Sequence, residues 1–419
     1  MNVSVHLTVP ADFCYPPGTI SVDQAMEFML ARARAPSSER ALALDDALGG
    51  VMARTLGSPI DVPGYANSQM DGYAVCADTV DREGSWLVVS QRIVAGMSPP
   101  ALRAGTAARI FTGAPIPDGA DTVVMQERCE LDGERVWIPA PSARGDNVRP
   151  RGNDIEVGQQ VLHVGQRLRA QHLGLAASVG IATLPVFSSL RVAFFSSGDE
   201  LRFPGQPLQP GQIYNSNRFI LRALIERLGC IAIDLGRVED TLDATKRILR
   251  QASEQADVVV SSGGVSVGDE DHVKNALQDV GELDMWRIAV KPGKPLAYGR
   301  IGEADFIGLP GNPVSTLVTF CLFVRPFLLT RMGVRAVQPR FMPVRAGFDW
   351  PRAAQRREFA RARISGDDRQ MPVASLHPKQ GSDVLSSTSW ADGLVEIPEG
   401  STVAVGDVLR YLDFDHLMS

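Results

Sequence analysis

The sequence predicts a multidomain α/β protein whose central part is a three-layer α/β domain. Between about 190 and 330, β-like runs alternate with amphipathic helical segments, which is typical of a mostly parallel sheet covered by helices. The stretches on either side instead contain short β-like runs separated by glycine, proline and aspartate turns. At 419 residues the chain is also too long for one ordinary hydrophobic core.

Composition and charge exclude several classes of protein. Hydrophobic residues make up 44% and charged residues 21% of the chain, which is typical of a globular protein. The net charge of −6 argues against general affinity for nucleic acid or for an anionic membrane, so we expect neither partner. The five cysteines have no C-x-x-C spacing, which predicts neither a zinc site nor a disulfide framework and fits a reducing cytoplasm.

The long apolar stretch 313–329 could suggest a membrane span. It contains Arg325 and Pro326, and it is shorter than a spanning helix needs. We therefore expect a buried helix that begins at Pro313.

Changes of texture along the chain predict four domains. A mixed N-terminal linker domain comprises two separate segments, 15–56 and 145–184, because helical spacing is present in both. An all-β insert occupies 57–144 between them. The α/β domain follows at 185–335, and a small β-barrel is expected at 340–419, where helical signals vanish.

Before residue 190 the sequence predicts short helical segments and the strands of the insert. Ser21 opens a helix, because Gln24 stands three residues later in the capping-box position and apolar residues follow at helical spacing. A second amphipathic segment covers about 40–54, and a helix is expected at 170–179. Strands of the insert are expected at 85–89, 107–112, 121–126 and 135–138.

The alternation after residue 190 is regular. A helix begins at Ser216 and stops at Gly229, a residue type suited to the end of a helix. Further helices are expected at 241–255, 270–280 and from Pro313. Strands are expected at 191–196, 231–235, 257–262, near 285–290 and at 305–309. The last domain has expected strands at 341–346, 357–364, 372–376, 394–397 and 408–412.

Polar segments follow four strands of the α/β domain. They are 196–200, 237–240, 261–271 and 309–313, and between them they contain serines, glycines and acidic residues. In an open α/β sheet, ligands bind beyond the carboxyl ends of the strands. We therefore expect all four segments to lie on one rim of the sheet and to form the binding site.

Two of these segments have the composition of a phosphate site. Glycines let the backbone approach a ligand, serines add hydroxyl donors, and a helix starts directly after each segment. A single glycine-rich turn is more often a plain connection, but several on one rim favour binding of a tetrahedral oxyanion. The candidate binding residues are Ser261, Ser262, Gly263, Gly264, Ser266 and Gly268, with Pro310, Gly311, Asn312 and Pro313.

Carboxylates on the same rim indicate a metal. Glu200, Asp240 and Asp271 each follow a strand, and gathered carboxylates repel an anion unless a hard cation lies between them. Oxygen ligands beside phosphate favour Mg²⁺. Stabilisation of a helix N-terminus is the plain alternative for Asp269 and Glu270, but it explains Glu200 and Asp240 less readily.

A basic segment could attract the anion. The sequence KPGKP at 291–295 carries Lys291 and Lys294, and Arg287 precedes it. A solvated surface is the alternative, but beside an expected oxyanion site we favour a functional role. The six histidines lie in no recognisable motif, so catalysis would depend on positioning and on Mg²⁺ electrostatics, without a covalent nucleophile.

Further features lie outside the α/β domain. In the last domain, strand alternation places Arg357, Arg361 and Arg363 on one face, which suits an anionic ligand or, equally, solvent. The stretches 67–74 and 149–155 mix small, polar and charged residues. Each taken alone is more typical of a turn than of a site.

Seven motifs are familiar together. They are NSQMDGYA, IFTGAPIPDGADTVVMQE, VRPRGNDI, FFSSGDEL, SSGGVSVGDEDHVK, KPGKPLAYG and LPGNPVS. In this order the sequence resembles the molybdopterin molybdenumtransferases, the MoeA-type enzymes, and their relative, the C-terminal domain of gephyrin. The resemblance runs from about residue 15 to the end of the chain.

The resemblance implies an activity and partners. The central domain would be of the molybdopterin-binding type. The enzyme would bind molybdopterin that carries an AMP on its terminal phosphate, together with molybdate and Mg²⁺, insert molybdenum at the dithiolene sulfurs and release AMP. The family forms homodimers of four-domain subunits, with the site in a cleft shared between subunits. A molybdopterin adenylyltransferase would supply the substrate, and molybdoenzymes would receive the finished cofactor.

The motif match also implies roles for individual residues. Catalytic roles fall to Asp71, Asp154, Glu200, Asp240, Asp271, Arg287, Lys291 and Lys294. Substrate binding falls to Thr112, Pro310, Pro313, Arg357 or Arg361, and Ser382. Glu200, Asp240 and Asp271 would bind or orient Mg²⁺, while the segment 261–271 would hold the phosphate arm. Many relatives have lysine where this chain has Arg287, which keeps the charge but allows a forked contact.

Two other functions remain open. A molybdopterin adenylyltransferase resembles residues 190–330 alone, but that activity needs neither the insert nor the barrel. A non-catalytic scaffold, which gephyrin is in part, would not need the intact carboxylates and lysines.

Overall fold

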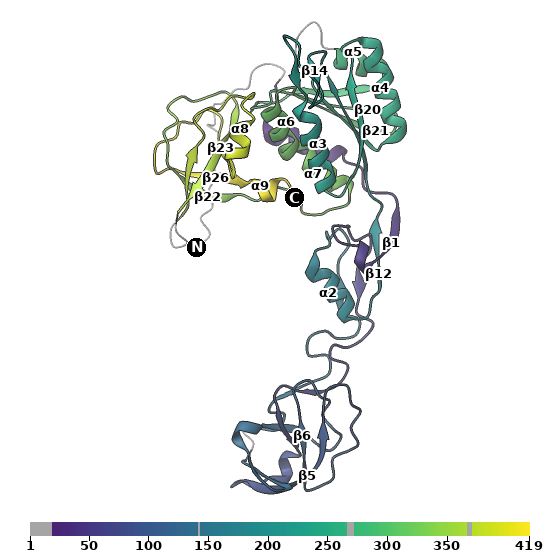
Figure 1. Cartoon of the computed structure of the whole chain (residues 1–419), viewed down its shortest axis with the longest axis vertical. Helices are drawn as coiled ribbons and strands as arrows, with labels where there is room; N and C mark the ends of the chain where they lie inside the picture. The colour runs from purple at the N-terminus through teal and green to yellow at the C-terminus, as the bar shows by residue number, and fades with distance from the viewer. Residues whose placement is uncertain (1–18, 141–142, 266–271, 367–370) are drawn as a thin grey trace. The chain divides into compact units, whose positions relative to one another are not determined.

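The computed structural model describes residues 19–140, 143–265, 272–366 and 371–419, which form two compact units (Figure 1). The first unit contains the described residues up to Arg40, Gly49–Ala53 and Val186–Ser419. The second unit contains Ala41–Leu48 and Arg54–Pro185. Each unit contains at least one six-stranded β-sheet of its own.

The first helix begins as the sequence predicts. Helix α1, Val22–Arg32, has Ser21 as its N-cap, and the Ser21 hydroxyl accepts a hydrogen bond from the Gln24 amide at 3.0 Å. The Ser21 amide in turn donates to the Gln24 side chain at 3.0 Å, which completes the capping box. Two otherwise unpaired amides of the first turn are thereby satisfied.

Loss of this cap has a measurable cost. We expect Ser21→Ala to lower the free energy of unfolding by about 1 kcal/mol, because the Gln24 amide loses its acceptor. Urea unfolding followed by circular dichroism measures the change. Gln24→Ala removes only the reciprocal bond and should cost less, so equal losses in the two variants would contradict this account.

The second unit is built from antiparallel pairs and one larger sheet. The amphipathic segment expected at 40–54 is a strand followed by a short 3-10 turn, and Gly49 in the left-handed region (φ 80°) helps prevent a helix there. The large sheet has the order β7-β4-β6-β5-β9-β8.

The small elements are β1 Glu39–Ala43, η1 Leu44–Asp46, β2 Leu56–Gly57, β3 Asn67–Ser68, β10 Val148–Arg149, β11 Gln160–Leu162, α2 Ala170–Ser178 and β12 Thr183–Phe187. The large sheet contains β4 Gly72–Val75, β5 Ser85–Ile93, β6 Thr106–Ile110, β7 Thr122–Met125, β8 Glu130–Asp132 and β9 Arg135–Ile138, with 3-10 turns η2 Ala77–Thr79 and η3 Gln126–Arg128.

Two strands of this sheet, β4 and β8, were not expected. Strand β4 begins in the stretch 67–74, which is more typical of a turn by composition, yet it pairs with both β6 and β7. A side chain at Gly72 would collide with the Val124 carbonyl of β7, so the strand can pass there only with glycine.

The α/β domain has a six-stranded sheet in the order β16-β13-β17-β21-β20-β18. The first four strands are parallel, β20 runs antiparallel to β21, and β18 runs antiparallel to β20. Strand β20 was not expected; it joins β21 through a tight turn at Gly302. The strands are β13 Arg191–Ser197, β16 Ile231–Val238, β17 Val258–Ser262, β18 Glu282–Arg287, β20 Pro295–Ile301 and β21 Ala304–Leu309. A separate two-stranded parallel pair consists of β14 Leu201–Arg202 and β15 Ile213–Tyr214.

Helices cover both faces of this sheet, which makes the predicted three layers (Figure 1). Along β17, Val258 and Val260 pack in one core cluster and Val259 packs in the other, as a pleated strand buried on both faces requires. Residues of α3 and α6 to α7 belong to the first cluster, and residues of α4 and α5 to the second. The helices are α3 Ser216–Arg227, α4 Leu242–Gln255, α5 His272–Val280, α6 Pro313–Thr319 and α7 Arg325–Arg331, and α6 and α7 are joined by a π-helical turn, η4 Phe320–Val324.

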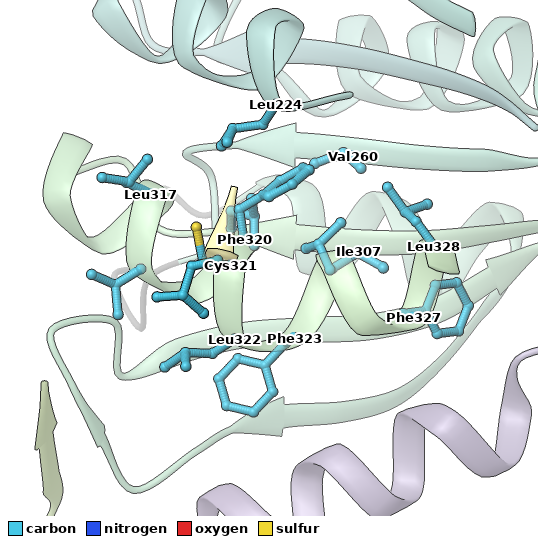
Figure 2. Close-up of a cluster of buried hydrophobic side chains, with 14 of the residues drawn as sticks. Leu224, Val260, Ile307, Leu317, Phe320, Cys321, Leu322, Phe323, Phe327 and Leu328 are labelled. Atoms are coloured by element: carbon cyan, nitrogen blue, oxygen red, sulfur yellow. The ribbon is translucent and has the colours of Figure 1, made fainter. Parts of the chain in front are cut away.

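The apolar helical stretch Pro313–Arg331 is the core helix that the sequence predicts. Phe320, Phe323 and Phe327 belong to the same core cluster as Val260 and Ile307 of the sheet (Figure 2). By length and composition this stretch could cross a membrane, but 89% of its most apolar window is buried inside the protein. Its hydrophobic surface is therefore already covered by the fold.

The chain ends in a closed barrel of five strands. Each strand pairs with two others in the cycle β23-β24-β22-β26-β25, which returns to β23. A short strand of the α/β domain, β19 Val290–Lys291, pairs in parallel with β23 and extends this sheet. The remaining elements are β22 Met342–Ala346, β23 Arg357–Ser365, β24 Val373–Leu376, α8 Ser386–Trp390, β25 Gly393–Ile397, β26 Val408–Asp413 and α9 Phe414–Leu417. The predicted fold class, an α/β protein with a β insert and a C-terminal barrel, is confirmed.

Candidate functional site

Four parallel strands bring the predicted polar segments to one rim. Strands β16, β13, β17 and β21 are neighbours and run in the same direction, so their carboxyl ends meet at one edge of the sheet. The expectation that the four segments share a rim is therefore confirmed for the described residues. This is the edge where ligands bind in open α/β sheets.

A cavity of about 950 Å³ lies at this rim. Its walls come from the strand ends of the α/β domain, the segment 291–295 and part of the barrel. Nine of the residues singled out from the sequence line it: Glu200, Ser262, Lys291, Lys294, Pro310, Gly311, Asn312, Pro313 and Ser382.

The carboxylates stand at two adjacent strand ends. Glu200 follows β13 and lines the cavity, with its side chain exposed. Asp240 follows β16 and is connected to the cavity through Ser197, whose hydroxyl donates to the Asp240 carboxylate at 3.2 Å. Both carboxylates therefore stand at the same rim of the sheet, and only Glu200 lines the cavity itself.

The glycine turn after β17 allows a close backbone approach. Gly263 has a φ of 89°, and a Cβ at that position would lie 2.6 Å from the Ser197 carbonyl. Gly264 is also in the left-handed region, with a φ of 70°. Both positions thus need glycine for the rim to close, and Ser261, just before them, is fully buried.

The two lysines differ in their environment. Lys291 belongs to β19, and its ammonium lies 3.0 Å from the buried carboxylate of Glu358. Lys294 is exposed, and its ammonium has no hydrogen-bond or ion-pair partner among the described residues. Arg287, at the end of β18, is partly buried and does not line the cavity.

The proline-rich turn before α6 contacts the barrel. Asn312 occupies the N-cap position of α6 as expected, but its side chain makes no capping bond. Its amide donates instead to the Ser382 hydroxyl at 2.8 Å. The α/β domain and the barrel are therefore joined at the cavity wall by a pair of polar side chains.

Several lining residues were not singled out from the sequence. The most informative is Asn217 in the first turn of α3, whose side chain donates to the Ser262 hydroxyl at 2.7 Å and to the Gly311 carbonyl at 2.6 Å. It thereby fixes two loops of the rim against each other. Asn217 could have been found from the sequence, because it lies in the first turn of a helix that begins beside the carboxyl ends of the parallel strands. The others include Leu201, Ile213, Tyr214, Asn215, Gln380 and Asp383.

The structure corrects the expectation for Arg357. Its face of β23 is shared with Arg361, as predicted, but Arg357 is buried and its guanidinium contacts three carboxylates. Those of Asp23, Glu396 and Glu399 lie 2.7, 3.2 and 3.0 Å away. All three nitrogens of Arg357 are thus engaged by carboxylates of the protein, and Arg357 does not line the cavity.

Arg361 is buried beside the cavity and stays a candidate. Its guanidinium donates to the Ser387 hydroxyl and to the Gly381 carbonyl, each at 3.0 Å. Burial lowers its pKa to about 10, although the charge of Glu358 opposes the shift. Arg361 does not itself line the cavity, but Gly381 does.

Three predicted residues lie in the second unit. The Asp71 carboxylate accepts hydrogen bonds from the amide and the hydroxyl of Thr112, at 2.8 and 2.9 Å. Asp154 is exposed, and its amide donates to the Val62 carbonyl. The bond from the Thr112 amide and then the bond from its hydroxyl hold the pKa of Asp71 below its ordinary value.

This pair allows a test by titration. We expect Thr112→Val to raise the pKa of Asp71 partway towards its ordinary value, because only the hydroxyl donor is lost. Carboxyl chemical shifts in an NMR titration report the change. A lowered pKa stabilises the fold above the ordinary pKa and loses that effect as pH falls, so the variant should lose less stability on acidification. Thr106→Val serves as the control, and an unshifted Asp71 in Thr112→Val would refute the assignment.

Three predicted residues, Ser266, Gly268 and Asp271, lie outside the described residues. The same is true of Asp269 and Glu270. Within the part of the chain that the structure describes, no group of three histidine, cysteine or acidic side chains could hold a metal ion. A magnesium site would therefore depend on Glu200 and Asp240 together with oxygens of the substrate.

Comparison with known proteins agrees with the architecture. Three family models match: the MoeA N-terminal region (domain I and II) over residues 20–180, a probable molybdopterin binding domain over 193–330, and the MoeA C-terminal region (domain IV) over 343–414. Together these models span most of the described chain.

Individual relatives match along nearly all of their length. The molybdopterin molybdenumtransferase of Haemophilus influenzae is 37% identical over 405 residues, which cover 95% of this chain and 100% of the relative. Molybdopterin molybdenumtransferase 2 of Mycobacterium tuberculosis is 36% identical over 88% of this chain and 94% of its own. The solved molybdopterin biosynthesis MoeA protein of Pyrococcus horikoshii OT3 has a TM-score of 0.82 and 25% identity, over 94% of this chain and 100% of its own. The chain belongs to the MoeA family of molybdopterin molybdenumtransferases, enzymes of molybdenum cofactor biosynthesis.

Proposed function

We propose that this protein inserts molybdenum from molybdate into adenylylated molybdopterin, with Mg²⁺, and releases AMP. The observation that carries the proposal is the composition of the cavity. Carboxylates, lysines, hydroxyls and glycine turns meet at one rim, and this set suits a substrate with phosphate groups, a divalent cation and an oxyanion. The names of the relatives supply the metal and the pterin.

The carboxylates fit Mg²⁺. This ion is commonly bound by one or two protein carboxylates together with substrate phosphates, and Glu200 and Asp240 follow adjacent strands on the same rim. When bound, Mg²⁺ would neutralise charge on the phosphoanhydride. Ser197 keeps the Asp240 carboxylate oriented through its hydrogen bond, and Asp271 is proposed as a third ligand.

The basic and hydroxyl groups have a different task. Lys294 can attract molybdate, because its charge is not offset by a carboxylate among the described residues, whereas Lys291 is anchored by Glu358. Ser262 and the Asn312–Ser382 pair offer donors for phosphate oxygens. These groups are held by the fold before the substrate arrives, which lowers the cost of reorganisation during the reaction.

The resemblance extends the proposal to the cellular setting. We infer a cytoplasmic homodimer that takes its substrate from a molybdopterin adenylyltransferase and passes the product to molybdoenzymes. Sedimentation of the purified protein tests the dimer, and a single species with the mass of the 45.2 kDa chain would contradict it.

One assay tests the reaction. The purified protein is incubated with adenylylated molybdopterin and Mg²⁺, with and without molybdate, and AMP is followed by chromatography. We expect AMP only when molybdate is present, and no AMP after chelation of Mg²⁺. Tight binding without AMP under any condition would favour a scaffold. Release of pyrophosphate from ATP and molybdopterin would instead indicate an adenylyltransferase.

A further inference from the structure

The side-chain amide of Asn217 contacts two strand ends at the rim. Asn217 lies in the first turn of α3 and is 8% exposed. Its Nδ2 atom lies 2.7 Å from the Ser262 hydroxyl and 2.6 Å from the Gly311 carbonyl. Ser262 ends β17 and Gly311 follows β21, so one side chain bonds to the ends of two neighbouring parallel strands.

Helix capping does not account for this contact. An asparagine at the start of a helix usually accepts a hydrogen bond from a backbone amide of the first turn. In α3 that role belongs to Asn215, whose side chain accepts from the Arg218 amide at 3.1 Å. The side chain of Asn217 therefore has a different task, and its partners lie on the rim of the sheet.

The Gly311 carbonyl decides which way the Asn217 amide points. A carbonyl oxygen can only accept, so the atom beside it must be the NH₂ group of the amide. The second hydrogen of this group is donated to the Ser262 hydroxyl. The arrangement leaves the Asn217 Oδ1 atom buried and without a hydrogen-bond partner among the described residues, which is uncommon for a contact that serves packing alone.

The direction of this bond determines what Ser262 can offer to a ligand. A serine hydroxyl has one hydrogen and two lone pairs, and Ser262 uses a lone pair to accept from Asn217. In the part of the chain that the structure describes, no group accepts the Ser262 hydrogen. Ser262 is 2% exposed and lines the cavity, so its hydroxyl is set to act as a donor there.

We propose that Asn217 is a positioning residue that holds the Ser262 hydroxyl as a hydrogen-bond donor to an acceptor atom of the substrate. The identity of the substrate rests on the function proposed above. Asn217 acts through Ser262 and does not itself need to touch the substrate. Its bond to Gly311 keeps the amide in the orientation that leaves the Ser262 hydrogen available.

A double-mutant cycle tests whether Asn217 acts through Ser262. Binding of adenylylated molybdopterin is measured by calorimetry without Mg²⁺ and molybdate, so that no turnover occurs, for the wild type, Asn217→Ala, Ser262→Ala and the double variant. We expect each single variant to raise Kd about 10-fold, because a hydrogen bond to the substrate is misdirected or lost. The double variant should bind no more weakly than Ser262→Ala, since Asn217 then has no hydroxyl to position.

Asn217→Asp reverses the hydrogen bond while it keeps the shape of the side chain. An ionised carboxylate can only accept, so it takes the Ser262 hydrogen that the substrate would otherwise receive. We therefore expect Asn217→Asp to raise Kd more than Asn217→Ala does. In the Ser262→Ala background the difference between the two variants measures repulsion by the added charge alone, and this difference should be smaller.

Asn275 provides the matched control for removal of an asparagine side chain. It is exposed on α5 of the same domain and does not line the cavity, so Asn275→Ala should bind as the wild type does. Additive losses in Asn217→Ala and Ser262→Ala would overturn the proposal, because Asn217 would then act only by joining two loops. So would unchanged binding in Asn217→Ala. The expected binding pattern in a protein that never releases AMP would instead refute the proposed function and leave the role of Asn217 standing.

Discussion

Arg357→Ala is expected to lower the free energy of unfolding by about 3 to 5 kcal/mol, because it removes the cation shared by the buried carboxylates of Glu396 and Glu399, of which Glu396 keeps only Arg410 at 3.3 Å among the described residues. The side chains of Glu396 and Glu399 are 3% and 0% exposed. Denaturant unfolding followed by circular dichroism gives the difference. Asp23→Asn is the control: it removes a partner that is 75% exposed, and it should cost less than about 1 kcal/mol.

The stability that Arg357→Ala loses should depend on pH in a defined direction. Burial raises the pKa of Glu396 above its ordinary value, and the charges of Arg410 and Arg357 oppose that shift. A raised pKa means that the folded state keeps a proton that the unfolded state has lost, so stability falls as pH rises above the ordinary value. Without Arg357 the pKa of Glu396 should rise further. The difference in free energy of unfolding between the wild type and Arg357→Ala should therefore be larger at about pH 8 than at about pH 5. A deficit that is independent of pH would contradict this network.

Glu200→Gln is expected to lower kcat for AMP release by about 100-fold or more, if the proposed reaction is correct. Glutamine keeps the shape of the side chain but loses the charge that would hold a divalent cation beside the substrate. The Mg²⁺ concentration needed for half-maximal rate should rise as well. Steady-state kinetics with varied Mg²⁺ measure both effects, and binding of AMP alone without Mg²⁺ should change little.

Asp199 provides the control for the loss of negative charge in Glu200→Gln. Asp199 precedes Glu200, pairs with Arg237 at 3.0 Å on the surface and does not line the cavity. Asp199→Asn removes the same charge from the same turn and should leave kcat unchanged. If both variants slow the reaction equally, the effect arises from the turn and not from a carboxylate at the reacting group.

Much of the fold could be predicted because local signals and the fold agree. The alternation after residue 190 gave the parallel strands and their helices, and Ser21 with Gln24 gave the start of α1. Strands β20 and β4 are among those that were not predicted, because their partners are distant or their composition is unusual. Strand β20 begins in the proline-rich segment 291–295, and β4 lies in a stretch with the texture of a turn. Both segments form strands because neighbouring strands pair with them, and their own sequences give little indication of a strand.

Site residues could be predicted only where they directly follow parallel strands, because the direction of those strands places such residues at one edge of the sheet. The rule for parallel strands located Glu200, Ser262 and the turn at 310–313, since all follow strands of one sheet. It could not reveal that Arg357 pairs with Asp23, which lies 334 positions away in the sequence. The amino-acid type fixes what a guanidinium can bind, and only the fold decides which acceptors reach it first.

The pairing of β19 with β23 limits how such enzymes can be recombined. Val290 and Lys291 belong to the central segment of the chain, yet they pair with Arg357 and Glu358 of the barrel. A chimera that takes its barrel from another parent would replace the strand against which the lysine is held, together with the carboxylate that anchors it. Exchanges between relatives should therefore succeed when residues 290–291 and 357–358 come from the same parent, even though they fall in different segments of the sequence.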